Sequence, residues 1–186
     1  MKEENCVILD FLPNGYPDRR HAEPIAQALG KTYFSLLELV PRENITLKTE
    51  EEVYIGEGKR DKIRFIRGQL AFNELTNMAR TLLPEIVEAL VLKNEAKFVE
   101  FFNKASIITP RMHQFQLLPG IGKKHLADIL SERKKKSFES FEDIRSRVKL
   151  FPDPVKSLVR RIMDEIEKDE KYSLFVNKGK KKNLQA

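Results

Sequence analysis

The spacing of hydrophobic residues along the chain changes once, near Ala71. Over residues 1–70, apolar residues come in short runs or alternate with polar ones, and turn signals such as Pro13-Asn14-Gly15 and Gly56-Glu57-Gly58 separate them. This pattern predicts five or six short strands, which are typical of a small closed or partly open barrel. The predicted strands cover residues 7–12, 25–29, 33–40, 45–48, 53–55 and 62–67.

From Ala71 onward the spacing lengthens to about 3.6 residues, the period of an α-helix. We expect Pro84 to begin a new helix and Asn94 to cap the next one. The spacing of the three phenylalanines in that next helix favours a buried face over a base-stacking platform. The residues of the first stripe and of this buried face are Phe72, Leu75, Met78 and Leu82, and Phe98, Phe101 and Phe102.

The two periods together predict an α+β protein in which an all-α unit follows a small β-barrel. The predicted parts are a barrel over residues 1–70, connecting helices over 71–105, a helical domain over 106–170 and a basic flexible tail over 171–186.

Composition narrows the class of protein. The chain has 186 residues, of which 41% are hydrophobic and 33% charged, a balance expected of a folded domain rather than a disordered chain. The single cysteine, Cys6, excludes an intramolecular disulfide and a cysteine-based zinc site. The apolar runs are too short to span a bilayer, and Lys2-Glu3-Glu4 leaves no secretory apolar region after Met1. We therefore expect a cytoplasmic protein without membrane contact, and a monomer.

The positive charge lies in the second half of the chain. Residues 1–104 contain 15 Lys/Arg and 17 Asp/Glu, whereas residues 105–186 contain 19 and 11. Such asymmetry fits a polyanion-binding half, although lysine and glutamate on solvated helices explain it equally well.

The segment around residues 109–130 carries the strongest motif. Thr109-Pro110 predicts a helix start, with a capping hydroxyl before a proline. In Leu118-Pro119-Gly120-Ile121-Gly122 we expect the proline to end that helix, both glycines to permit positive φ and Ile121 to plug the core. The next helix would begin with bare amides beside Lys123 and Lys124, a combination that suits a phosphate.

This segment resembles the helix-hairpin-helix motif of DNA- and RNA-binding proteins. The resemblance implies that the hairpin grips a backbone phosphate without reading sequence. The residues that inherit this role are Gly120, Ile121, Gly122, Lys123 and Lys124. His125 follows them and either touches phosphate or is an ordinary surface histidine.

A degenerate second copy of the motif appears 32 residues later. In this alignment Leu118 matches Leu150, and the glycine hairpin matches Phe151-Pro152-Asp153-Pro154. Ser140 is expected to cap the first helix of this copy. Because Asp153 would repel phosphate, we expect only the first hairpin to bind an anion.

Further basic residues either widen a polyanion surface or form solvated faces. They follow the second helix of the first hairpin or lie on the predicted barrel: Arg133, Lys134, Lys135 and Lys136, and Lys59, Arg60, Arg64 and Arg67.

Nearly the whole chain resembles an archaeal family known as domain of unknown function 655. The matching stretches are residues 7–15, 24–41 and 117–144. The resemblance implies an OB-like barrel followed by a helix-hairpin-helix unit, and RNA as a more probable ligand than DNA.

No catalytic constellation stands out. His21, His113 and His125 are scattered, and the Asp18/His21 pair alone is weak support for acid–base chemistry. We predict a sequence-nonspecific nucleic-acid-binding protein that is not an enzyme and has no metal or cofactor. The alternative is a protein-interaction adaptor on ribosomal or transcription machinery.

Overall fold

The computed structural model describes residues 2–17 and 23–178. The chain forms two compact units, and their boundaries fall inside two long helices. The described part of the first unit comprises residues 2–86 and 165–178, and the second unit comprises residues 87–164.

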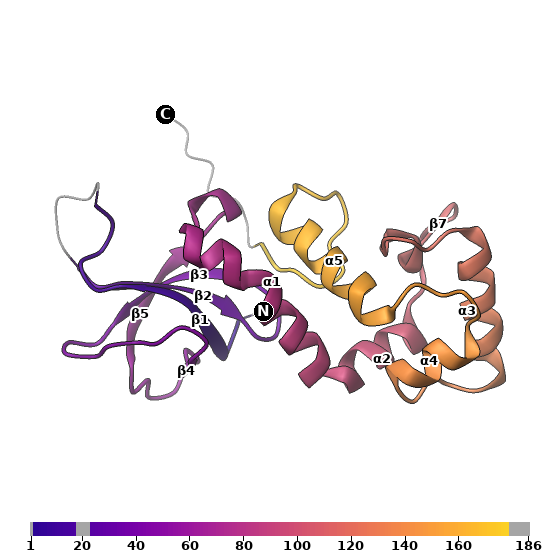
Figure 1. The fold of residues 1–186 in the computed structure, drawn as a ribbon, viewed down its shortest axis with the longest axis horizontal. Helices are drawn as coiled ribbons and strands as arrows, with labels where there is room; N and C mark the ends of the chain where they lie inside the picture. The colour runs from indigo at the N-terminus through magenta and orange to yellow at the C-terminus, as the bar shows by residue number, and fades with distance from the viewer. Residues whose placement is uncertain (1, 18–22, 179–186) are drawn as a thin grey trace. The chain divides into compact units, whose positions relative to one another are not determined.

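The first unit contains a curled, five-stranded antiparallel sheet (Figure 1). Its strands are paired in the order β4-β1-β2-β3-β5 and form a half-barrel, as expected for an OB-like barrel. Five of the six predicted strands are confirmed. Their bounds are β1 Asn5–Leu12, β2 Ile25–Gly30, β3 Leu36–Pro41, β4 Glu52–Tyr54 and β5 Ile63–Gln69.

The sixth predicted strand, residues 45–48, is wrong. This segment is irregular, yet Leu47 is only 3% exposed and belongs to the core of the half-barrel. The alternation therefore reported burial of one side chain rather than strand pairing. The other core residues are Cys6, Ile8, Ala26, Ala28, Leu37, Leu39, Val53, Ile55 and Ile63.

The other face of the sheet is covered by the short helix η1 (Phe72–Glu74) and by the start of α1 (Asn77–Lys93). Buried Gln27 on β2 binds the carbonyl of Glu74 and the amide of Thr76. The Thr76 hydroxyl accepts a hydrogen bond from the Ala79 amide and donates one to Asp10. These bonds fix where α1 begins.

Pro84 lies inside α1 and does not begin a new helix as predicted. Leu83, Val87 and Val91 are fully buried on both sides of the proline. Burial of these side chains offsets the roughly 3 kcal/mol that an interior proline costs.

Residues 171–178, predicted as the start of a flexible tail, are attached to the first unit. The carboxylate of Glu165 is fully buried and accepts hydrogen bonds from the amides of Leu174, Phe175 and Val176 at 2.7–3.0 Å. The amide of Asn177 donates to the carbonyl of Tyr33. The rest of the predicted tail, residues 179–186, lies outside the described residues.

The second unit is mainly helical. After α1 it contains α2 (Glu95–Lys104), α3 (Lys123–Lys135), α4 (Phe141–Arg147) and the first part of α5 (Pro154–Glu167). Phe98 and Phe102 of α2 are buried, which confirms that this face is core. Phe102 stacks on Phe115 with ring centroids 5.5 Å apart.

The predicted helix start at Thr109-Pro110 is wrong. Residues 107–113 form a two-stranded hairpin, β6 (Ile107–Thr109) and β7 (Met112–His113), followed by the short 3-10 helix η2 (Gln114–Leu117). The β-branched run before Pro110 favours extended backbone, and the proline then falls in the turn. The first turn of the motif therefore joins a 3-10 helix to α3, and only the second joins two α-helices.

We predict that Glu165→Ala lowers the free energy of unfolding by about 2–4 kcal/mol, because three amides lose a charged acceptor. Urea denaturation measures this loss. Glu167→Ala is the matched control, since Glu167 is an exposed glutamate of the same helix. Equal stability of the two variants would show that Glu165 does not anchor residues 174–176.

Candidate nucleic-acid interface

Two buried side chains and one backbone hydrogen bond fix the first turn, residues 118–122. Leu118 and Ile121 are buried, and the Ile121 amide donates to the Leu118 carbonyl at 3.2 Å. Ile121 therefore plugs the core as predicted, and the exposed part of the turn is Gly120 and Gly122.

The two glycines have different roles. Gly120 has φ +85°, and a Cβ built there would lie 2.9 Å from Cγ of Pro152, so both backbone and space require glycine. Gly122 has φ −89° and open space around its Cβ position. Gly122 therefore does not adopt the positive φ that glycine permits, and it matters instead because it has no capping side chain.

Gly122 is the N-cap of α3 and leaves the start of this helix uncapped. The Leu126 amide is bonded to the Gly122 carbonyl at 3.0 Å, so the amides of residues 123–125 precede the regular helical bonds. Lys123 and Lys124 are exposed and have no hydrogen-bond or ion-pair partner within the described residues. The start of α3 thus presents backbone amides without intrahelical acceptors, together with the unpaired ammonium groups of Lys123 and Lys124.

His125 contacts both turns. Its Nδ1 lies 3.1 Å from the carbonyl oxygen of Gly120, and its ring meets the edge of Phe151 at 6.2 Å between centroids. These contacts link the first turn to the second.

The second turn, residues 148–153, repeats the first bend of residues 118–122 in a different register from the predicted one, and it has one more residue before the helix cap. The Phe151 amide donates to the Val148 carbonyl at 3.3 Å, as Ile121 does to Leu118. Leu150 has φ +58° and therefore matches Gly120. The alignment of Leu118 with Leu150 is wrong, because Leu118 is buried whereas Leu150 is 85% exposed.

Asp153 closes the amide site of the second turn. Its Oδ1 accepts a hydrogen bond from the Lys156 amide at 3.0 Å, and its Oδ2 pairs with Arg145 at 2.8 Å. Burial raises the pKa of the Asp153 carboxyl, but the bonds from Lys156 and Arg145 outweigh this effect and hold the pKa below its usual range. The two turns therefore share their first bend, and they differ in length before the helix and in chemistry.

The basic residues at the end of α3 are not one free cluster. Arg133 donates to the carbonyls of Phe102 and Ala105, and burial lowers its pKa. Lys135 pairs with Glu132, and Lys136 pairs with Glu139. Of the four predicted residues, only Lys134 has no hydrogen-bond or ion-pair partner within the described chain.

The predicted basic residues of the half-barrel also differ in whether an acidic side chain pairs with them. Arg67 lies between Glu38 and Glu23 and is neutralised by both. Lys59 and Arg64 are exposed and have no acidic partner within the described residues, and the Arg64 guanidinium lies 5.7 Å from the Phe65 ring centroid.

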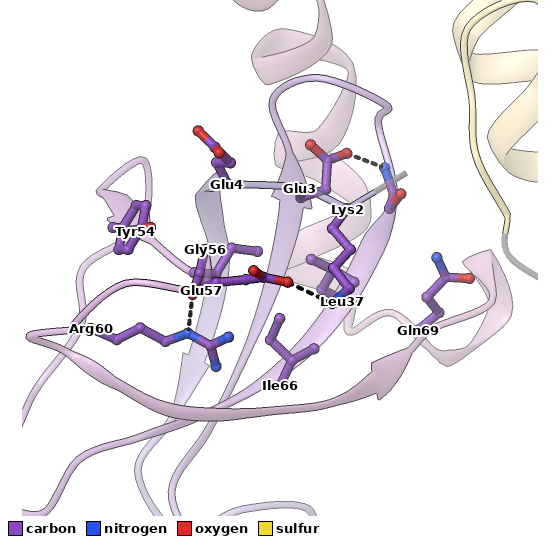
Figure 2. Close-up of a pocket in the computed structure, with 12 residues that line it drawn as sticks. Lys2, Glu3, Glu4, Leu37, Tyr54, Gly56, Glu57, Arg60, Ile66 and Gln69 are labelled. Carbon is purple, nitrogen blue, oxygen red and sulfur yellow. Dashed lines mark hydrogen bonds and ion pairs between the residues drawn. The ribbon is translucent and has the colours of Figure 1, made fainter.

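Arg60 lines a cavity of about 490 Å³ in the first unit (Figure 2). Its Nε donates to the Gly56 carbonyl at 2.8 Å. The charged residues of the lining are Lys2, Glu3, Glu4, Glu57 and Arg60, so carboxylates outnumber cations. This lining does not suit a phosphate.

Other candidate chemistry gains no support from the geometry. Asp18 and His21 lie outside the described residues. Within residues 2–17 and 23–178, no three His, Cys, Asp or Glu side chains gather to hold a metal ion. His113 caps η2 through Nδ1, and burial, followed by the charge of Arg133, lowers its pKa. No helix in the described part of the chain is long and apolar enough to cross a membrane.

Three missed features belong to the second turn: the exposed tip Leu150, the contact of Pro152 with Gly120, and the cap on α5. The Asp153-Pro154 pair is a regular helix-start signal and could have revealed the cap. Nothing local in the sequence indicates positive φ at a leucine.

Comparisons with known proteins agree on a single family. The family described as "Protein of unknown function (DUF655)" matches residues 2–177. The uncharacterized protein MJ0038 of Methanocaldococcus jannaschii is 44% identical over 176 residues, which cover 94% of this chain and 80% of that protein. The crystal structure of Af1531 from Archaeoglobus fulgidus, assigned to the same family, has a TM-score of 0.84 and 44% identity. It covers 94% of this chain and 100% of that one.

We predict that Leu150→Gly raises the free energy of unfolding by about 0.5–1 kcal/mol, because glycine relieves the left-handed strain and little buried surface is lost. Leu150→Ala keeps a Cβ and should leave stability unchanged. Thermal or urea denaturation of both variants tests this, and a destabilised glycine variant would contradict the strain.

Proposed function

Because the chain belongs to the archaeal DUF655 family, whose description assigns no activity, we propose from its own geometry that it binds nucleic acid through the first turn. The observation that carries the proposal is the uncapped start of α3 at Gly122, flanked by Lys123 and Lys124. Backbone amides at a helix start, together with unpaired lysines, form a donor set that complements a phosphate.

The proposed contact is to the backbone and not to the bases. Amides and lysine ammonium groups accept any phosphate oxygen, so they position a strand without reading its sequence. The excess of cations in residues 105–186 supports the same partner, since it concentrates polyanions near the turn. Lys134 is a further candidate contact; Arg133 is not, because carbonyls already occupy its guanidinium.

RNA is the preferred ligand in this proposal, on the basis of the family resemblance. We also propose a binding role rather than catalysis. The reason is chemical: phosphate contacts by amides and lysines neither activate a nucleophile nor protonate a leaving group.

We predict that Gly122→Asp weakens binding by on the order of ten-fold or more, because the new carboxylate would cap α3 as Asp153 caps α5. The open space at Gly122 and its ordinary φ accept a side chain, and the cap should stabilise the helix by about 0.3–0.5 kcal/mol. Fluorescence anisotropy with a labelled single-stranded RNA measures binding, and urea denaturation measures stability.

Gly122→Ala is the control, since it fills the same space without occupying the amides. The alanine variant should bind like the native protein. If the aspartate variant binds as tightly as the alanine variant, the amides of α3 do not hold the ligand.

We predict that the affinity falls steeply with salt, and that the double variant Lys123→Gln/Lys124→Gln reduces the slope of log K against log salt by about 1.4, since each lysine on a single strand contributes about 0.7. Lys135→Gln is the control because Glu132 already pairs with Lys135. A salt-independent association, or retention of acidic proteins instead of nucleic acid, would favour the adaptor role.

A further inference from the structure

Leu150 is the most unusual side chain of the second unit. It is 85% exposed, more than any other exposed large hydrophobic residue of the described chain, and it has φ +58°. A leucine in the left-handed region costs roughly 1–2 kcal/mol. A strained and solvated apolar side chain contributes nothing to the stability of the fold, which is a pattern associated with functional positions.

The repeat shows what this position replaces. Leu150 occupies the place of Gly120 in the first turn, where glycine meets the backbone requirement without strain. Asp153 occupies the cap position that Gly122 leaves open. The second turn has therefore lost both features that suit a phosphate and has gained an apolar tip.

The tip lies beside the proposed phosphate site. Pro152 of the second turn would contact a Cβ at Gly120, and Phe151 meets the ring of His125. Lys149, directly before the tip, is exposed and has no hydrogen-bond or ion-pair partner within the described residues. A ligand held at the start of α3 therefore passes close to an apolar side chain that is flanked by a cation.

We infer that Leu150 packs against a base of the same nucleic acid whose phosphate the first turn holds, an inference that rests on the proposed function. Apolar side chains contact or separate bases wherever base faces are accessible. A fully paired duplex offers such a face only after it is unstacked, whereas a single strand or loop offers it directly. The substrate class is therefore unpaired nucleic acid.

The experiment compares Leu150→Ala with Leu92→Ala, a matched variant at another exposed leucine (53%) of the second unit. Leu150→Ala should weaken binding to a single strand of about 12 nucleotides by on the order of five-fold. Binding to a perfect duplex of the same sequence should be weaker for the native protein and should not change in the variant. Leu150→Gly should bind as weakly as Leu150→Ala although its fold is expected to be more stable.

A second measurement reports on the base itself. A 2-aminopurine placed within the single strand should gain fluorescence when the native protein binds, because insertion of Leu150 separates it from its neighbours. Leu150→Ala should lose this gain even at saturating protein concentration, whereas Leu92→Ala should keep it. A change in stability or affinity alone would not produce this difference.

Each result separates this inference from the proposed function. If the native protein binds and Gly122→Asp does not, but Leu150→Ala binds and reports 2-aminopurine like the native protein, the base contact is wrong and the phosphate site stands. Equal affinity for strand and duplex also overturns the inference. If the native protein binds no nucleic acid, both proposals fail.

Discussion

The need of every backbone amide for an acceptor is the constraint on which this structure depends. Carboxylates of the chain meet it repeatedly: Glu3 binds the amides of Thr32 and Tyr33, Glu165 binds those of residues 174–176, and Asp153 caps α5. At the start of α3 the cap is a glycine, so no side chain does this. Solvent or a ligand must supply the acceptor there.

The paired turns share one backbone bend and differ in chemistry. The same i to i+3 bond and the same left-handed third residue occur in both, so the shape does not require glycine at every copy. Where Pro152 approaches Gly120, only glycine fits; where the tip is open to solvent, a leucine is tolerated at a cost in strain. The side chains at the third and the cap positions, together with the extra residue between them in the second turn, therefore distinguish the two turns.

The sequence predicted the features that depend on local patterns. Short apolar segments bounded by turn residues located the strands of the half-barrel, Ser140 capped α4 as expected, and Phe98 and Phe102 were correctly assigned to the core. It failed where distant contacts decide. Pro84 stays within α1 because residues on both sides of it are buried, and the register of the second turn depends on which residue has positive φ. The residues next to Pro84 do not indicate that burial, and the residues of the second turn do not indicate which of them has positive φ.

Candidate site residues differ in the same way. A lysine in the sequence is a charge, but only the fold decides whether that charge is free. Lys123 and Lys124 are exposed without partners, Arg67 is held by two glutamates, and Arg133 is turned onto carbonyls. Because ion pairs and carbonyl bonds occupy some of these cations, the number of lysines and arginines in a segment overstates how many are free to contact a phosphate. Among the predicted site cations, Lys123, Lys124 and Lys134 of the second unit have no partner within the described residues, and neither Lys59 nor Arg64 of the first unit has an acidic one. A contact limited to the first turn would gain little affinity unless a neighbouring group such as the second turn also touched the ligand.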